Sequence, residues 1–264
     1  MSGLSDQCPT ERFTGLAGLY AQCRPGYPDE ALDFIVERCG LGSESVLVDV
    51  GCGTGISARL FARRGVPIIG IEPNAEMRAQ AEDVALPPGL PAPVYRAGRA
   101  EATGLPATTA AAVLAAQAFH WFDPDAALRE FHRILKPGGW VALMWNERDP
   151  SDLFTAAYGA VIKSTPEAAA IEGPRSRASD ALLSSPLFEE ATRVSFANAQ
   201  VLDQEGVLGR AFSVSYAPRE PQAAQRFADA LRTVFAQFEL EGRVVLQYNT
   251  SVFSARRKDR MSCS

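Results

Sequence analysis

The sequence is poor in the residues that most often build metal sites and disulfide frameworks. It has two histidines in 264 residues, and its five cysteines are scattered, with no Cys-x-x-Cys pair among Cys8, Cys23, Cys39, Cys52 and Cys263. Structural zinc needs closely spaced thiolates or imidazoles, and disulfide-stapled domains need a dense, even set of cysteines. We therefore expect no metal, and we expect reduced thiols in a cytoplasmic protein.

Long apolar runs and an excess of positive charge are also lacking. An uncharged stretch at residues 107–119 is too short and too rich in Ala and Thr to span a bilayer, and residues 1–13 lack the pattern of a secretory signal. The 26 Lys and Arg residues are outnumbered by 31 Asp and Glu residues, which gives a net charge of −5. These features predict neither a membrane span nor a nucleic-acid partner.

Short apolar segments alternate with helical patterns between residues 28 and 150. We expect strands at residues 46–50, 66–71, 94–97, 112–116 and 140–145. We expect helices at residues 28–39, 56–64 and 123–135, and a further helix capped by Asn74. This alternation predicts a parallel sheet with helices on both faces.

The alternation stops after residue 150. Residues 151–192 read as helical without a strand, and two further strands at 193–202 and 244–253 surround a helix at about 221–238. The chain length is compatible with one elaborated domain or two small ones, at about 150 residues per domain.

A glycine loop follows the first predicted strand, with the sequence Gly51-Cys52-Gly53-Thr54-Gly55. In an open α/β sheet this place binds nucleotide-like ligands, because glycines let the backbone approach the ligand. The dinucleotide fingerprint requires a third glycine at position 56, where this chain has Ile56. The loop is therefore tighter and less suited to a pyrophosphate.

Two carboxylates flank the glycine loop. Glu72 ends the second predicted strand, 21 residues after Gly51, where a carboxylate can accept from ribose hydroxyls. Asp49 places a negative charge beside the loop, which favours a ligand with a cationic amine and disfavours a pyrophosphate.

Together these motifs resemble those of class I S-adenosylmethionine (SAM)-dependent methyltransferases. Residues 48–55 resemble motif I, residues 71–73 with Met77 resemble motif II, and residues 133–139 resemble the segment before the fifth strand. Tyr20 and the segments 24–28, 117–122 and 145–149 resemble the small-molecule "type 11" branch, which includes trans-aconitate methyltransferase-like proteins. The resemblance implies an α/β fold with a Rossmann-like, doubly wound seven-stranded sheet, mostly parallel with an antiparallel edge strand, plus a helical cap.

The resemblance also implies a division of the chain and a cofactor. Residues 1–27 would form an N-terminal lid segment, residues 28–150 the SAM-binding core, and residues 151–264 a cap insertion and the strands that complete the sheet. Met77 also lies on the apolar stripe of its helix, so a plain core role suits it equally well. The residues expected to bind SAM are Tyr20, Asp49, Gly51, Cys52, Gly53, Thr54, Gly55, Glu72, Pro73, Met77, Ala100, Glu101 and Gln117.

The acceptor side rests on fewer residues. His120 would act as a general base or as a hydrogen-bonding residue of the pocket, and Arg24 would orient an acceptor carboxylate or tie down the N-terminal segment. Substrate-pocket residues would be Trp121, Trp145 and Asn146. We expect methyl transfer to a small molecule, with oxygen preferred over nitrogen or carbon. The alternatives are a SAM-binding protein without transfer and a nucleotide-dependent oxidoreductase, which Ile56 and Asp49 disfavour.

Overall fold

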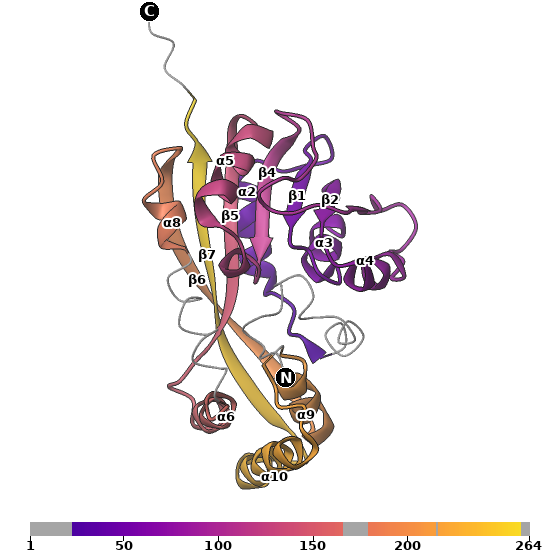
Figure 1. The fold of residues 1–264 in the computed structure, drawn as a ribbon, viewed down its shortest axis with the longest axis vertical. Helices are drawn as coiled ribbons and strands as arrows, with labels where there is room; N and C mark the ends of the chain where they lie inside the picture. Colours follow the sequence, from indigo (N-terminus) through magenta and orange to yellow (C-terminus); the bar gives the residue numbers. More distant parts are fainter. Residues whose placement is uncertain (1–22, 166–178, 215, 260–264) are drawn as a thin grey trace, which may run out of the picture.

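A computed structural model of the chain describes residues 23–165, 179–214 and 216–259. These residues form one seven-stranded sheet of order β3-β2-β1-β4-β5-β7-β6 (Figure 1). Five strands are parallel, namely β1 (Leu47–Val50), β2 (Ile68–Ile71), β3 (Val94–Arg96), β4 (Ala110–Ala116) and β5 (Leu135–Arg148). Strand β7 (Val244–Arg257) is antiparallel to both β5 and β6 (Phe188–Leu202). The predicted α/β sheet is confirmed, with the reversed strand β7 one position inside the edge.

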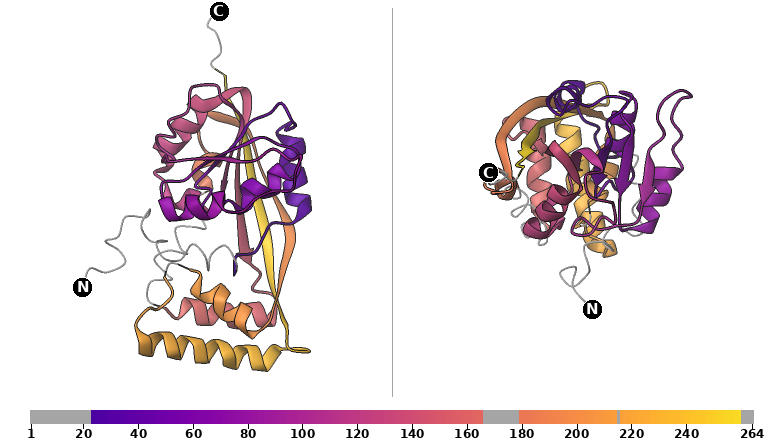
Figure 2. Two further views of the ribbon diagram at one scale, coloured as in Figure 1. Left: turned by 90° about the vertical axis from the view of Figure 1, so that its right-hand side faces the viewer. Right: turned by 90° about the horizontal axis from the view of Figure 1, so that it is seen from above.

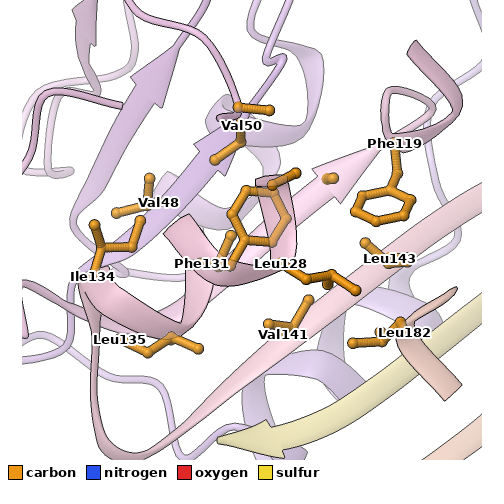
Figure 3. Close-up of a cluster of buried hydrophobic side chains, with 14 of the residues drawn as sticks. Val48, Val50, Phe119, Leu128, Phe131, Ile134, Leu135, Val141, Leu143 and Leu182 are labelled. Carbon is orange, nitrogen blue, oxygen red and sulfur yellow. The ribbon is translucent and has the colours of Figure 1, made fainter. Parts of the chain in front are cut away.

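Helices cover both faces of this sheet. On one face, α5 (Pro124–Ile134) and the short α8 (Asp180–Leu183) pack on a cluster that includes Val48, Phe119, Phe131 and Leu143 (Figure 3). On the other face, α2 (Asp29–Arg38) and α3 (Ile56–Ala62) pack on Leu47 and its neighbours. Val48 and Leu47 face opposite sides because side chains alternate along a strand.

Side-chain caps fix where the helices begin. Asn74 accepts a hydrogen bond from the Met77 N–H at 3.0 Å and starts α4 (Ala75–Glu82), as the sequence predicts. Asp123 accepts from the Ala126 N–H at 3.0 Å, with Pro124 at the first helical position of α5. A cap of this kind stabilises a helix by about 1 kcal/mol.

Strands β5, β7 and β6 are 14, 14 and 15 residues long, and they continue beyond the rest of the sheet (Figures 1 and 2). Their far ends pack against α6 (Leu153–Lys163), α9 (Gln204–Phe212) and α10 (Pro221–Phe238). We call these three helices and the strand ends they cover the cap. The cap has its own apolar cluster, centred on Tyr158, Leu231 and Leu246, each 0% exposed.

The structure differs from the sequence-based expectations in three places. Strand β5 begins at Leu135 and so includes residues 136–139, whereas a strand was expected only from residue 140. Its pairing with β4 absorbs them through a register shift between Ala110 and Ala112. Strand β6 begins at Phe188, so the expectation of no strand in 151–192 is wrong for its last residues, and α9 was not predicted.

None of the helices in the described ranges combines the length and apolar composition that crossing a membrane would require.

Candidate active site

A cleft of about 1160 Å³, including its open mouth, lies at the carboxyl ends of β1, β2 and β4. Strands β2 and β4 flank β1 on opposite sides, so this is the point where the strand order reverses. In open α/β sheets such a point is the usual ligand crevice. The cleft is lined by the glycine loop, by the ends of β2 and β4, by residues 98–101, by the segment at Arg24, and by Arg210 of the cap.

The three glycines of the loop have different neighbours. All three have positive φ, at 69° for Gly51, 54° for Gly53 and 73° for Gly55. A Cβ on Gly51 would lie 2.7 Å from the Cβ of Ala118, and one on Gly55 would collide with the Tyr95 hydroxyl. A Cβ on Gly53 would have nothing within 4 Å. Gly51 and Gly55 are therefore needed for packing, whereas Gly53 faces open space in the cleft.

Glu72 connects the end of β2 to the glycine loop. Its Oε2 accepts a hydrogen bond from the Gly53 N–H at 3.0 Å, and its Oε1 accepts from the Asn74 N–H at 2.9 Å. Burial raises the pKa of the Glu72 carboxyl, and these N–H donors partly oppose the shift. A carboxylate has about four lone-pair sites, so room for two ligand hydroxyls remains.

Asp49 lies behind the loop rather than in the wall of the cleft. It is 0% exposed, and the Ser57 hydroxyl donates to its Oδ2 at 2.6 Å. Burial raises the pKa of Asp49 to about 7, while the Ser57 hydrogen bond lowers it and the Glu72 charge raises it further. Asp49 was expected to contact the cofactor, and the structure places it one layer behind.

Thr54 supplies an unsatisfied polar atom at the cleft. The residue is 1% exposed, and its Oγ1 has no hydrogen-bond partner among the residues that the structure describes. Buried hydroxyls are normally paired, so this atom suits a polar group of a ligand.

The remaining residues that were expected to bind the cofactor also gather at the cleft. Met77 is 3% exposed and Ala100 is 4% exposed, and both line it. Glu101 lines it too, but its Oε1 accepts from the Asp123 N–H at 3.0 Å and so also holds the start of α5. Cys52, Pro73 and Gln117 complete this group, and Tyr20 lies outside the described residues.

The turn after β4 carries the aromatic residues that were expected on the acceptor side. Gln117 has a φ of 58°, and its N–H donates to the Met144 carbonyl at 2.8 Å. The following 3₁₀ helix η2 (Phe119–Trp121) places Trp121 in the wall of the cleft. His120 does not line the cleft, and its ring lies 4.7 Å from the Trp121 ring, centroid to centroid.

Trp145 and Asn146 do not line the cleft. Trp145 is 3% exposed and packs edge-on against Phe253 at 5.5 Å in the core below α5. Asn146 donates through Nδ2 to the Gly26 carbonyl at 2.9 Å and accepts through Oδ1 from Thr250 at 2.6 Å. The expected pocket role of Trp145 therefore finds no support in this geometry, whereas Asn146 lines a second cavity on the cap side.

Sequence reasoning missed Arg210, a cap residue in the wall of the cleft. It is 5% exposed, and its Nε donates to the Tyr248 hydroxyl at 3.2 Å. Arg24 lies on the same side and donates to the Ser213 carbonyl at 3.3 Å. The missed signal is a charged residue among the apolar positions Val207, Leu208 and Ala211 of α9.

Within the described ranges, no group of three or more His, Cys, Asp or Glu side chains could hold a metal ion.

Residues 48–143 match the model of a methyltransferase domain. The chain is 38% identical over 150 residues to an uncharacterised methyltransferase of Mycobacterium tuberculosis, and the aligned part makes up 57% of this chain and 58% of the relative. It is 35% identical over 131 residues to a ubiquinone biosynthesis O-methyltransferase of Pseudomonas aeruginosa, covering 49% of this chain and 56% of that protein. The chain thus spans little more than half the length of the curated relatives it matches.

The fold is also similar to solved structures. A candidate type II methyltransferase from Anaeromyxobacter dehalogenans superposes with a TM-score of 0.62 at 22% identity, over 88% of this chain and 97% of that one. At this identity the likeness concerns the fold alone. The domain match and the curated relatives show that residues 48–143 form a methyltransferase domain, and the structural likeness shows a methyltransferase fold over most of the chain.

Proposed function

We propose that this protein transfers a methyl group from SAM to a small-molecule acceptor, with oxygen preferred over nitrogen or carbon. One observation carries the proposal: the Gly53 backbone and the Glu72 carboxylate meet at an open part of the cleft. The fit to the cofactor is supported by the space above Gly53, by the remaining lone pairs of Glu72 and by the unpartnered Thr54 hydroxyl.

Each part of the cleft wall has a task that suits this cofactor. Glu72 would accept hydrogen bonds from the ribose, and Met77 and Ala100 offer an apolar surface to the adenine. When bound, SAM supplies a methyl group that is already activated on a sulfonium. The chain therefore has to align the acceptor and exclude water, and such positioning can contribute about 7–11 kcal/mol. Trp121 could stabilise the cation through its ring by about 0.5–2 kcal/mol.

Transfer to oxygen is supported by the Pseudomonas aeruginosa relative, which is described as an O-methyltransferase. An alcohol or phenol acceptor must lose its proton. His120, in the turn that carries Trp121, is our candidate for the general base.

Calorimetry tests the cofactor first. We expect SAM and its demethylated product, S-adenosylhomocysteine, to bind, and NAD not to bind. Binding of NAD without SAM would favour an oxidoreductase and overturn the proposal. A screen of alcohols, phenols, acids and amines for the mass gain of one CH2 unit, which marks a methyl group replacing a hydrogen, then separates an enzyme from a protein that only binds SAM.

The two histidines provide a matched pair for testing the base. We expect His120→Ala to lower turnover and to leave SAM affinity nearly unchanged. His132→Ala is the control, because His132 lies in the last turn of α5, where it bonds to the Lys258 carbonyl at 3.0 Å, and not in the turn that carries Trp121. An unchanged rate in His120→Ala would remove the assignment.

A further inference from the structure

Arg210 lies between two cavities. It lines the cleft described above, and it also lines a second cavity of about 1160 Å³, open to solvent, on the cap side. The second cavity also carries Arg148, Lys163, Glu147 and Tyr248. Glu147 faces Ser251 and Arg193, accepting from the Ser251 hydroxyl at 2.7 Å and lying 3.7 Å from the Arg193 guanidinium. Arg210 is therefore a cation at the junction of the two spaces.

The hydrogen bonds of Arg210 leave its charge uncompensated. Nε donates to the Tyr248 hydroxyl at 3.2 Å, whereas Nη1 is buried and has no hydrogen-bond partner in the described part of the chain. None of the ion pairs in that part involves Arg210. A guanidinium does not lose its proton in proteins, so burial cannot neutralise it.

Another buried charge in this protein shows the contrasting arrangement. Glu130 is 8% exposed, and it accepts from the Thr103 N–H at 2.9 Å and from the Arg133 Nε at 2.7 Å. A buried ion is costly unless it is paired and hydrogen-bonded. Glu130 meets that condition among the described residues, and Arg210 does not, which points to a partner that is not among them.

The orientation of Arg210 is set by its neighbours. The Tyr248 hydroxyl, which accepts from Nε, donates in turn to Gln200 Oε1 at 3.3 Å. Gln200 Nε2 donates to the Cys23 carbonyl at 3.1 Å, next to Arg24 of the cleft wall. The chain of bonds holds one edge of the guanidinium and leaves Nη1 for a ligand.

We propose that Arg210 anchors an acidic group of the methyl acceptor, a carboxylate or a phosphate, at the junction of the two cavities. The inference rests on the proposed function only in calling this ligand the acceptor. The anchor itself requires only that a small anion binds at Nη1. A planar guanidinium pairs with either oxygen acid, and it makes charge-assisted hydrogen bonds that are stronger than neutral ones.

Binding measurements on the full chain test the anchor without relying on turnover. Protein saturated with S-adenosylhomocysteine is titrated calorimetrically with hexanoate, benzoate and phenyl phosphate, and with hexanamide and benzamide as uncharged counterparts. We expect at least one acid to bind at least tenfold more tightly than its amide. The better of the carboxylate and phosphate probes identifies the acid.

Two variants of the cap separate an anchor from a structural arginine. Arg210→Met should abolish the preference for acids and leave the amides unaffected. Its melting temperature should stay the same or rise, since replacing an uncompensated buried ion by an apolar side chain is often neutral or stabilising. Arg226→Met is the control, because Arg226 is an exposed residue of α10 and carries the same charge change.

Three results would overturn the inference: equal affinity of acid and amide in the unmodified protein, acid binding retained in Arg210→Met, or the same loss in Arg226→Met. If acids bind through Arg210 while no acceptor is ever methylated, the proposed function fails and the anchor stands.

Discussion

The two walls of the cleft hold their polar groups in different ways. On the sheet wall, Glu72 bonds to Asn74 and Gly53, which are 2 and 19 residues away in the sequence. On the cap wall, Arg210 bonds to Tyr248, 38 residues away, and behind the wall Tyr248 bonds to Gln200, which bonds to the Cys23 carbonyl 177 residues away. The sheet wall is therefore assembled from segments that are close in the sequence. The cap wall forms only when segments far apart in the sequence, around residues 23, 200, 210 and 248, have come together.

The difference also concerns charge. Both oxygens of Glu72 accept hydrogen bonds from backbone N–H groups before any ligand arrives. Arg210 lacks a carboxylate partner within the described residues and depends on a ligand for compensation. The charged group of the sheet wall is therefore hydrogen-bonded in advance, whereas the charged group of the cap wall still has an open donor.

The largest expected effect separates the glycines of the sheet wall. Gly51→Ala should destabilise the protein by about 2–5 kcal/mol, combining left-handed strain with overpacking against Ala118. Gly53→Ala should cost only about 1–2 kcal/mol, from strain alone, yet it should weaken SAM binding because the new methyl group enters the cleft. Urea denaturation and calorimetry measure the two quantities. Equal stability losses in both variants would contradict this division of roles.

The next effect concerns Glu72. Glu72→Ala should weaken SAM binding at least tenfold, about 1.4 kcal/mol. The variant loses both the carboxylate that accepts from the ribose hydroxyls and the hydrogen bond that holds the Gly53 N–H. Glu82→Ala, at the exposed end of α4, is the matched control and should bind SAM normally. Calorimetric titration of both variants checks this, and full affinity in Glu72→Ala would show that the cofactor binds elsewhere.

The smallest effect is a pH dependence that arises behind the sheet wall. Burial raises the pKa of Asp49 in the folded protein to about 7, well above the value of an exposed aspartate. The folded state therefore holds this proton more tightly, and stability falls as pH rises towards 7 and levels off above it. Relative to Asp49→Asn, the unmodified protein should lose about 1 kcal/mol between pH 6 and pH 7. Denaturation curves of both proteins at the two pH values measure this difference, which should be absent if Asp49 titrates normally.

The sequence predicted the sheet half of the fold well, because its signals are local. The apolar run before Gly51, the cap at Asn74 and the Asp123–Pro124 start of α5 each specify an element within a few residues. The edge strand β6 was placed too late in the chain. Its first residues, such as Glu189 and Glu190, are exposed and polar, so they lack the apolar pattern of a buried strand.

The residues of the candidate site likewise differ in whether a local sequence pattern specifies them. Glu72, Met77 and Ala100 lie at the cleft because all three follow shortly after the ends of the neighbouring strands β2 and β3, with Met77 in the first turn of α4. Trp145 has its side chain in the core because alternation along β5 turns it to the α5 face, together with Val141 and Leu143. The place of Arg210 in the cleft wall could not be predicted from the sequence, because it depends on α9, a helix that no sequence pattern had indicated.

Strands β5, β7 and β6 run without interruption from the sheet into the cap, and this continuity limits how the distance between sheet and cap can change. Adding two residues to each strand would lengthen the ladder by about 7 Å and keep every side chain on its own face. Adding one residue would turn all later side chains to the opposite face. Related proteins that accommodate longer substrates by moving the helices outward should therefore carry insertions of even length in these three strands.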